Sequence, residues 1–396
     1  MTSTHEQPVL AALAPAVACA LAVMSVYAFG IYLFSAQIPM FMLEVGIGMA
    51  DAGLVTSVGM IAFLSGALTT HHAVELLGEK HLILATLMAC SLSYFLLSGA
   101  QTLVSLILLR AVLGFASATI WVPMVRLVPR FAPWGFAGLL LGITNSGSNI
   151  GIVLNGAILA WIQPSFGSQG VWTFASLLTF FSFLVFGVVV PRSDTSQNTR
   201  KESSSRNRPG PSVPLKFIIL LAALSGAVGV PGTTFLSAYA QSELGRPPES
   251  SGLMWALIGI TGAAGSIILG RIADKSSVLL TVAVAFACQT AAFTFIALNF
   301  PLISQFGLEA CACVMAVGYF ALYGLLPTLI SGAVPVRFLV SAFGYATAFQ
   351  ALGGAAGNFV VGLVLETSSS YIFVYAALGA IAFIAAIVSS LVANRK

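Results

Sequence analysis

The stretch from Leu106 to Trp121 contains one arginine, Arg110, in an otherwise uncharged apolar run. A guanidinium can bind a carboxylate or a phosphate through two parallel hydrogen bonds, so Arg110 could hold an anion. A charge in hydrocarbon costs about 2.5–3.5 kcal/mol on insertion scales, so a charge there needs a partner or a function. Two structural alternatives stay open. Arg110 could extend toward the membrane interface, or it could bond helix carbonyls inside a bundle.

Aromatic and amide side chains in other apolar runs could complete a binding site around this arginine. Trp121 follows Arg110 at helical spacing, with small residues between them, and would supply a stacking surface. Asn145 and Asn149 would form hydrogen bonds from one face of a later helix. Packing and interhelical hydrogen bonding are the structural alternative for all of these side chains. Four tyrosines have hydroxyls that need partners when buried: Tyr27, Tyr32, Tyr319 and Tyr323.

The composition identifies the surroundings of these residues. Hydrophobic residues make up 58% of the 396 residues, and charged residues only 7%. An ordinary soluble domain is about one quarter charged, so this composition indicates an all-α integral membrane protein. The apolar runs are about 20 residues long, which as helix spans a hydrocarbon layer of about 30 Å.

Polar segments divide the apolar sequence into twelve predicted transmembrane helices. The segment 191–216, rich in Ser, Pro and Arg, separates the sixth from the seventh and is typical of a flexible linker. We therefore expect an N-terminal six-helix bundle at 1–190 and a C-terminal six-helix bundle at 217–396. The predicted helices are 12–37, 52–70, 82–99, 102–125, 135–161, 171–190, 216–240, 252–270, 278–298, 305–330, 339–365 and 371–392.

Most basic residues lie on one side of the membrane in this predicted topology. All but two of the 16 Lys and Arg residues fall in the linker, at the C-terminus or in loops on the linker side. The exceptions are Arg246, which faces the other way, and Arg110, which lies within a helix. By the positive-inside rule, both termini and the linker are predicted to be cytoplasmic. The expected location is a bacterial inner membrane, crossed many times.

The two halves also resemble each other in order and in register. GIYLFSA at 30–36 matches GTTFLSA at 232–238, and VPRF at 128–131 matches VPVRF at 334–338. The near-constant offset indicates a duplicated six-helix unit. Because each unit has an even number of helices, the two copies lie the same way up and form parallel repeats.

These features resemble the major facilitator superfamily over nearly the whole chain. GRIADK, from Gly270 to Lys275, resembles the G-x-x-x-D-(R/K) loop that the family places between the second and third helices of each half. RAVLG, from Arg110 to Gly114, resembles the family's R-x-x-x-G signature on the fourth helix. In GSNIGIVLNG, Ser148 stands where antiporters of the family often have proline. Within the family, the sequence is most similar to bacterial branches near the monocarboxylate and oxalate/formate carriers and their uncharacterised relatives.

The resemblance implies a rocker-switch transporter with a substrate site near the midplane, between two bundles. In this family, the first, fourth, seventh and tenth helices line the cavity. Fold alone does not identify the substrate.

The charges favour an anionic substrate. None of the 12 acidic residues falls deep in a predicted helix, whereas carriers of organic cations and proton-driven drug pumps need an intramembrane carboxylate. We expect a secondary transporter of a small, monocarboxylate-like organic anion. The alternative is efflux of a hydrophobic or neutral compound, with Arg110 structural. Proton coupling through the substrate or Glu309 stays open, as does the direction of transport. The expected substrate contacts are Arg110, Trp121, Tyr27, Tyr32, Asn145, Asn149, Tyr319 and Tyr323.

Charged residues near the cytoplasmic helix ends are expected to act as gates. We expect Asp274 to pair with Arg337, and Glu75 to pair with Arg126 or Arg130. Such pairs would close the cytoplasmic side in one state and break in the other. The full predicted gating set is Gly270, Asp274, Lys275, Arg337, Glu75, Arg126 and Arg130.

Other classes of function lack the residues that they need. An intramembrane enzyme would show clustered His, Asp, Glu or Cys within the helices, and a primary pump would show a glycine-rich phosphate loop. The five cysteines fall in apolar runs without zinc spacing. A twofold repeat around one central site favours a carrier over a channel. We therefore expect no catalytic residue, metal, cofactor or nucleic-acid partner. The expected partners of a monomer are the substrate, the lipid bilayer and protons as a candidate coupling ion.

Overall fold

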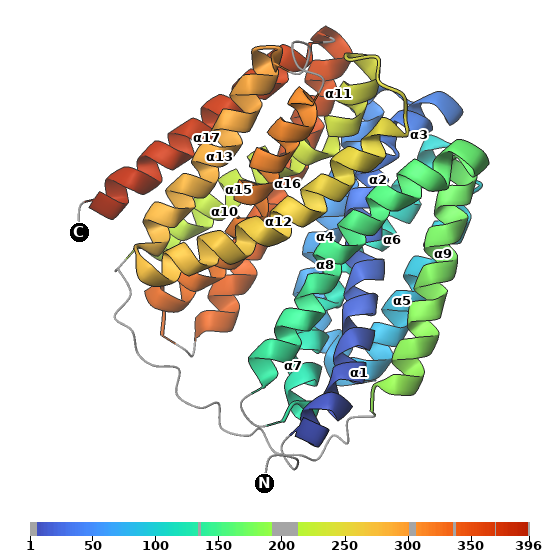
Figure 1. Cartoon of the computed structure of the whole chain (residues 1–396), viewed down its shortest axis with the longest axis vertical. Helices are drawn as coiled ribbons and strands as arrows, with labels where there is room; N and C mark the ends of the chain where they lie inside the picture. The colour runs from blue at the N-terminus through green and yellow to red at the C-terminus, as the bar shows by residue number, and fades with distance from the viewer. Residues whose placement is uncertain are drawn as a thin grey trace.

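The chain folds into two bundles of helices in the computed structural model (Figure 1). The structure describes residues 6–133, 136–191, 213–300, 306–335, 338–368 and 370–394. The N half contains α1 (Glu6–Val23), η1 (Met24–Leu33), α2 (Phe34–Ala36), α3 (Ile38–Glu44), α4 (Met49–Leu77), α5 (Glu79–Leu97), α6 (Leu103–Thr119), α7 (Trp121–Phe131), α8 (Ala137–Trp161) and α9 (Gln163–Val189). The C half contains α10 (Leu215–Thr234), α11 (Leu236–Ser242), α12 (Ser250–Lys275), α13 (Val278–Ala297), α15 (Gly307–Ala333), α16 (Leu339–Ser368) and α17 (Tyr371–Asn394).

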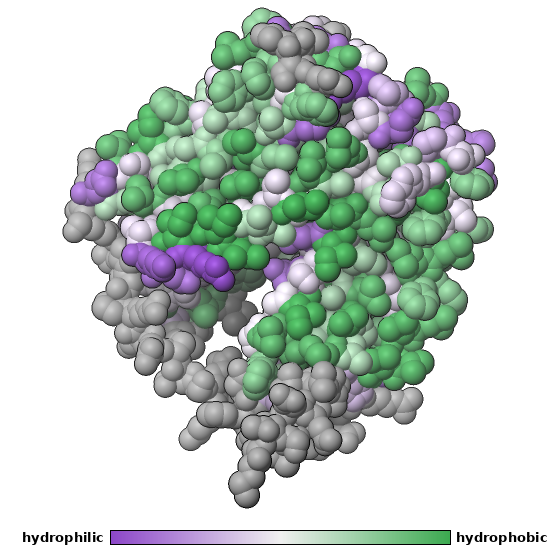
Figure 2. Space-filling view, viewed as in Figure 1, coloured by the Kyte–Doolittle hydropathy of each residue, from purple (hydrophilic) through white to green (hydrophobic). Residues whose placement is uncertain are grey.

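The number of spans agrees with the sequence prediction. Among the described residues, 11 helical stretches are long and apolar enough to cross a membrane, and the bent pair α6 and α7 makes a twelfth. Exposed leucine, isoleucine, valine and phenylalanine side chains cover the outer surface, as a helical bundle in lipid requires (Figure 2). The predicted all-α fold of twelve transmembrane helices is therefore confirmed.

Two predicted spans differ in their course. The fourth bends by 41° just before Pro123 and continues to Phe131, beyond the predicted end at 125. Proline lacks the N–H that the helix ladder needs, and its ring collides with the preceding turn. The sixth begins at Gln163 rather than 171, and it breaks at Gly167, where φ is 62°. Glycine adopts this conformation without the penalty that a side chain would bring.

The first span contains a π-helix, η1, between α1 and α2. A π-helix widens the turn and is frequent at functional sites. Three neighbouring helices (α5, α6 and α8) each donate one side-chain hydrogen bond to a carbonyl of η1, which supports this irregular backbone from outside. The bonds run from Tyr94 to Ser25 (2.8 Å), from Ser117 to Val26 (3.4 Å) and from Asn155 to Ala28 (3.0 Å).

The two halves meet at the end of the molecule opposite the linker, which we call the closed end. There α4 packs against α16, and α8 packs against α12. Glycines make the approach close: a Cβ on Gly53 would lie 2.6 Å from the Asn358 carbonyl oxygen, and one on Gly156 would lie 2.4 Å from that of Gly252. Ser57 adds a hydrogen bond between halves by donating to the Ala355 carbonyl at 2.8 Å.

The halves are apart at the other end, which we call the linker end. A Cβ built on Gly142 of α8 or on Gly344 of α16 would meet no atom of the described chain within 4 Å. Asn145 and Tyr345, one turn or less from these glycines, are exposed. Figure 2 shows the surface hollowed between the halves on this side. The structure is therefore open toward the linker end and closed at the opposite end.

Candidate functional site

A cavity lies between the halves, below the closed α4–α16 contact. Its volume is about 30 Å³, and helices of both halves line it. Met60 and Phe63 of α4 lie near the middle of that helix, so the cavity is near mid-depth. The lining residues are Tyr27, Ile31, Met60, Phe63, Val230, Tyr319, Tyr323, Thr347, Gln350 and Ala351.

Three of the four predicted tyrosines come together at this cavity, from helices far apart in the sequence. Tyr27, Tyr319 and Tyr323 line it, and the hydroxyls of Tyr319 and Tyr323 are 2.8 Å apart. Tyr32 is not among the lining residues. Its ring packs between the two halves, with its centroid 6.2 Å from that of Trp255 and 5.6 Å from that of Phe320. Tyr32 thus contacts the C half directly.

The other aromatic and amide candidates are not among the residues that line the cavity. Trp121 is half-buried and stands edge-on to Tyr27, with ring centroids 6.0 Å apart. Asn149 is half-buried, and its side-chain oxygen has no partner among the described residues. Asn145 is exposed toward the open linker end. Asn155, from the same helix, instead bonds the backbone of η1 and so fixes where Tyr27 lies.

Arg110 lies behind the cavity wall, inside the N half. It is 1% exposed, and Phe34 covers it with its ring centroid 5.2 Å from the guanidinium carbon. Gly59 of α4 leaves the space for the guanidinium, because a Cβ there would lie 2.6 Å from the same carbon. The next residue, Met60, lines the cavity. Arg110 itself is not among the residues that line the cavity.

The guanidinium of Arg110 is not satisfied in this state. Its Nε and Nη1 atoms are buried and have no hydrogen-bond partner in the described part of the chain. Buried guanidinium donors without acceptors are costly, and a cation–π contact with Phe34 offsets only part of that cost. Among the described residues the guanidinium bonds no carbonyl, and the side chain is buried rather than exposed. The unpartnered donors are of the type that binds an oxyanion.

Phe34 belongs to an aromatic cluster that the sequence did not reveal. Phe41 and Tyr94 stack on the two sides of Trp172, with ring centroids 5.8 and 5.9 Å from the Trp172 centroid. Phe34 is tilted against Trp172 at 6.1 Å. In an apolar helix such rings look like ordinary packing residues, so only the contact of Phe34 with Arg110 distinguishes this cluster.

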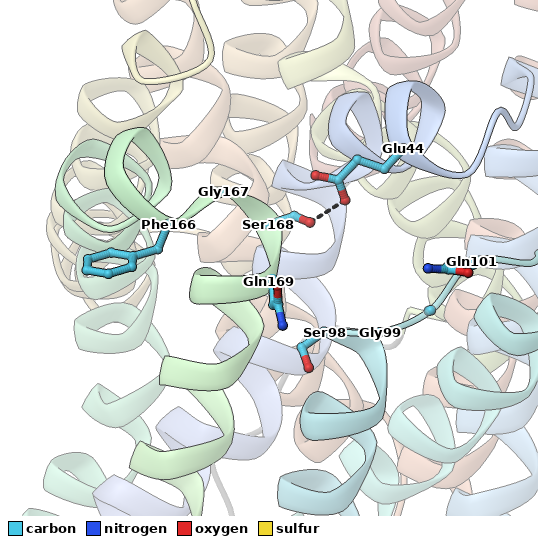
Figure 3. Close-up of a pocket in the computed structure, with 9 residues that line it drawn as sticks. Glu44, Ser98, Gly99, Gln101, Phe166, Gly167, Ser168 and Gln169 are labelled. Carbon is cyan, nitrogen blue, oxygen red and sulfur yellow. Dashed lines mark hydrogen bonds between the residues drawn. The ribbon is translucent and has the colours of Figure 1, made fainter.

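A larger pocket lies at the closed end, within the N half alone (Figure 3). Its volume is about 360 Å³, and its walls are the ends of α3 and α5 and the break in α9. Ser168 donates a hydrogen bond to Glu44 across it, as the close-up shows. This pocket does not touch the C half, so it does not belong to a path between the halves.

The gating residues are arranged differently from the prediction where the structure describes them. Arg130 pairs with Glu79, through hydrogen bonds of 2.7 and 3.2 Å, and not with Glu75. Glu75 instead lies 3.1 Å from His71, one turn away on α4. Glu79 begins α5 and faces the end of α7, whereas Glu75 is exposed on the other side of the Gly78 turn. Arg126 contacts His71 at 3.4 Å.

The second predicted gate is only partly described. Asp274 and Lys275 are exposed in the last turn of α12, and a Cβ built on Gly270, one turn earlier, would meet no described atom within 4 Å. Arg337 lies outside the described residues. The pairing of Asp274 with Arg337 stays a prediction.

Glu309 forms an ion pair within the C half. Its carboxylate is 7% exposed in the first turn of α15 and accepts a hydrogen bond from Arg246. Both residues belong to the closed end, away from the cavity. This places Glu309 at the helix end and not at mid-depth.

Removing one hydroxyl of the tyrosine pair should weaken substrate binding without unfolding the protein. We expect Tyr319→Phe to raise the transport KM by about two- to tenfold, because one neutral hydrogen bond contributes about 0.5–1.5 kcal/mol. Concentration-dependent uptake into proteoliposomes measures the effect. The matched control is Tyr345→Phe, an exposed tyrosine of α16, and an equal change in KM for both variants would contradict the assignment.

Comparison with known proteins relates this architecture to known families. The family model of the Major Facilitator Superfamily matches residues 20–358. A gallate transporter from Pseudomonas putida is 27% identical over 168 residues, which cover 42% of this chain and 37% of that relative. The match thus spans little more than a third of the relative's length.

Solved transporter structures have the same fold. The structure of the nucleoside transporter NupG superposes with a TM-score of 0.76 at 13% identity, and the match covers 96% of this chain and 98% of that chain. A bacterial homologue of the human lysosomal transporter Spinster, in an inward-facing and occupied conformation, has a TM-score of 0.73 at 14% identity. That match covers 97% of this chain and 96% of the other. At such low identity these likenesses concern the fold alone.

Proposed function

Because this chain belongs to the major facilitator superfamily, we propose that it is a secondary transporter of a small, monocarboxylate-like organic anion and works by alternating access. Membership in the family makes the chain a multi-pass membrane transporter rather than an enzyme. The substrate class, the mode of coupling and the site residues are the proposal.

The observation that carries the proposal is the unsatisfied guanidinium of Arg110. Its Nε and Nη1 donors are buried without partners, and no acidic residue falls deep in a span to neutralise it. A substrate carboxylate would supply both the acceptors and the charge. The α4 backbone at Gly59 lies against the guanidinium, and the next residue, Met60, lines the cavity.

The cavity lining supports a substrate that also has an apolar or aromatic part. Tyr27, Tyr319 and Tyr323 offer ring faces and hydroxyls, and Gln350 adds an amide that already bonds Ser225 at 3.1 Å. The similarity to a gallate transporter agrees with a carboxylate on an aromatic ring. Trp121, beside Tyr27, would extend the stacking surface.

The proposed orientation follows from the positive-inside rule. The linker and both termini would be cytoplasmic, in a bacterial inner membrane. The linker end is the open end, so the described conformation would be inward-facing. The next state of the cycle would separate the halves at the closed end.

A second candidate is efflux of a hydrophobic or neutral compound. It is favoured by the lining of the cavity, in which no described residue is charged. In that case Arg110 would be structural, held by Phe34 and the α4 backbone.

Competition with a neutral analogue separates the two candidates. Purified protein in proteoliposomes should take up labelled benzoate, and unlabelled benzoate should compete at least about tenfold better than benzamide. The reason is that a carboxylate–guanidinium bond contributes about 1.5–3 kcal/mol, whereas a carboxamide brings no charge. Equal competition by benzamide would support the neutral-compound candidate and overturn the anion proposal.

A further inference from the structure

The start of α4 is completed by a residue of the other half. The first N–H groups of a helix have no partner within the helix and must be bonded from outside. Gly48, the N-cap, donates its N–H to Asp51 of the same helix at 3.2 Å. Met49 and Ala50 donate theirs to one carboxylate oxygen of Glu366, at 2.7 and 3.2 Å. Glu366 lies in the last turn of α16, in the C half.

The position of this carboxylate is defined sterically as well. Gly48 has no side chain, and a Cβ there would lie 2.6 and 2.9 Å from the two carboxylate oxygens of Glu366. The Gly48 backbone is extended (φ −85°, ψ 178°), which any residue can adopt. The glycine at this position therefore leaves room for Glu366 rather than serving a turn.

The contact is at the far tip of the α4–α16 interface. Moving inward from it, Gly53 meets Gly362, Ser57 bonds Ala355, and the cavity follows. Opening the closed end by rotating the halves about the cavity region would move the tip furthest. The Met49 and Ala50 N–H groups would then lose their protein partner, and Glu366 would lose the positive end of the helix dipole.

We infer that Glu366 is a latch, which stabilises the conformation closed at this end by capping the N-terminus of α4 across the two halves. The latch belongs to one state only, so it sets the balance between the two states of the cycle. The inference rests on the alternating-access part of the proposed function and not on the substrate.

Distance measurements on the purified protein in nanodiscs test the latch. Spin labels at Leu43→Cys on α3 and Phe373→Cys on α17 would report the separation of the halves, because both positions are exposed near the closed end. The half-buried Cys288 and Cys313 are replaced by serine to suppress background labelling.

We expect Glu366→Gln to raise the ratio of separated to closed molecules by about two- to fivefold, the range for a charge at a helix N-terminus. Gly48→Ala should act in the same direction, because its Cβ displaces the carboxylate. The double variant should show no larger change than Glu366→Gln alone, since both changes break one contact.

The matched control is Glu44→Gln, which removes a carboxylate at the same end whose hydrogen bond to Ser168 stays within the N half. It should leave the distance distribution unchanged. An unchanged distribution in both Glu366→Gln and Gly48→Ala, or an equal change in Glu44→Gln, would overturn the latch. Because this assay uses no substrate, failure of the anion proposal would leave its result intact.

Discussion

Replacing Arg110 with lysine should reduce benzoate uptake by about 10- to 150-fold. Lysine keeps the charge but loses the planar fork that can bond both oxygens of a carboxylate. The expected loss corresponds to a charge-assisted hydrogen bond of about 1.5–3 kcal/mol. Initial rates of uptake into proteoliposomes, normalised to the amount of folded protein, measure the effect.

Two further measurements separate substrate binding from a structural role. Benzoate should raise the melting temperature of the wild-type protein and leave that of the Arg110→Lys variant unchanged. The matched control is Arg126→Lys, at an exposed arginine of α7 near His71, whose melting temperature benzoate should raise as it does in the wild type. Full uptake by Arg110→Lys would show that the fork is not used. A lowered melting temperature with normal uptake per folded molecule would assign Arg110 to the scaffold.

Replacing Gly362 with valine should reduce transport at least about tenfold by blocking closure of the closed end. A Cβ at Gly362 would lie 2.7 Å from the Met49 carbonyl oxygen and 2.8 Å from the Gly53 Cα. These are backbone atoms of a packed helix, which cannot turn away as a side chain can. Overpacking of this kind costs about 1–3 kcal/mol, and here it acts on one state of the cycle.

The spin-label pair of the latch experiment, at positions 43 and 373, reads out this effect directly. Gly362→Val should shift the distribution toward separated halves. Gly344→Val is the matched control on the same helix, because its Cβ would meet no described atom within 4 Å in the present state. It should not increase the separation at the closed end. Loss of transport in Gly362→Val without any shift in distance would contradict the steric explanation.

The sequence predicted the spans well because their signal is local. Apolar length and interrupting polar segments follow from the hydrocarbon thickness, so most predicted limits fall within a few residues of the observed helices. The exceptions have identifiable causes. Pro123 bends the fourth span, and the break at Gly167 hides the first turns of α9 from a pattern of continuous apolar residues.

The sequence alone could not show which carboxylate pairs with Arg130. Glu75 and Glu79 are one turn apart in a charged segment, and either could reach Arg130 by sequence spacing alone. The turn at Gly78, with φ at +75°, sends the two carboxylates in different directions. Only the start of α5 faces the end of α7, and therefore Glu79 forms the ion pair with Arg130.

Arg110 shows the same limit for the candidate site. The sequence identified it as the single charge in a span, and it identified the tyrosines that gather from both halves at the cavity. The orientation of the Arg110 side chain did not follow from the sequence, because Phe34 and Gly59, which lie against the guanidinium, come from two other elements.

By itself, then, the sequence determined that the helices lie in lipid, where the twelve spans fall and which side chains are candidates for the site. Hydropathy and helical spacing determine these features because they act over short stretches of chain. The tertiary structure decided which end is closed, how η1 is supported and that Glu366 caps a helix of the other half. These features depend on contacts between residues as distant as Met49 and Glu366. Such contacts leave no local pattern in the sequence. The residues around a carboxylate at a helix end are the same whether the carboxylate faces water or another helix.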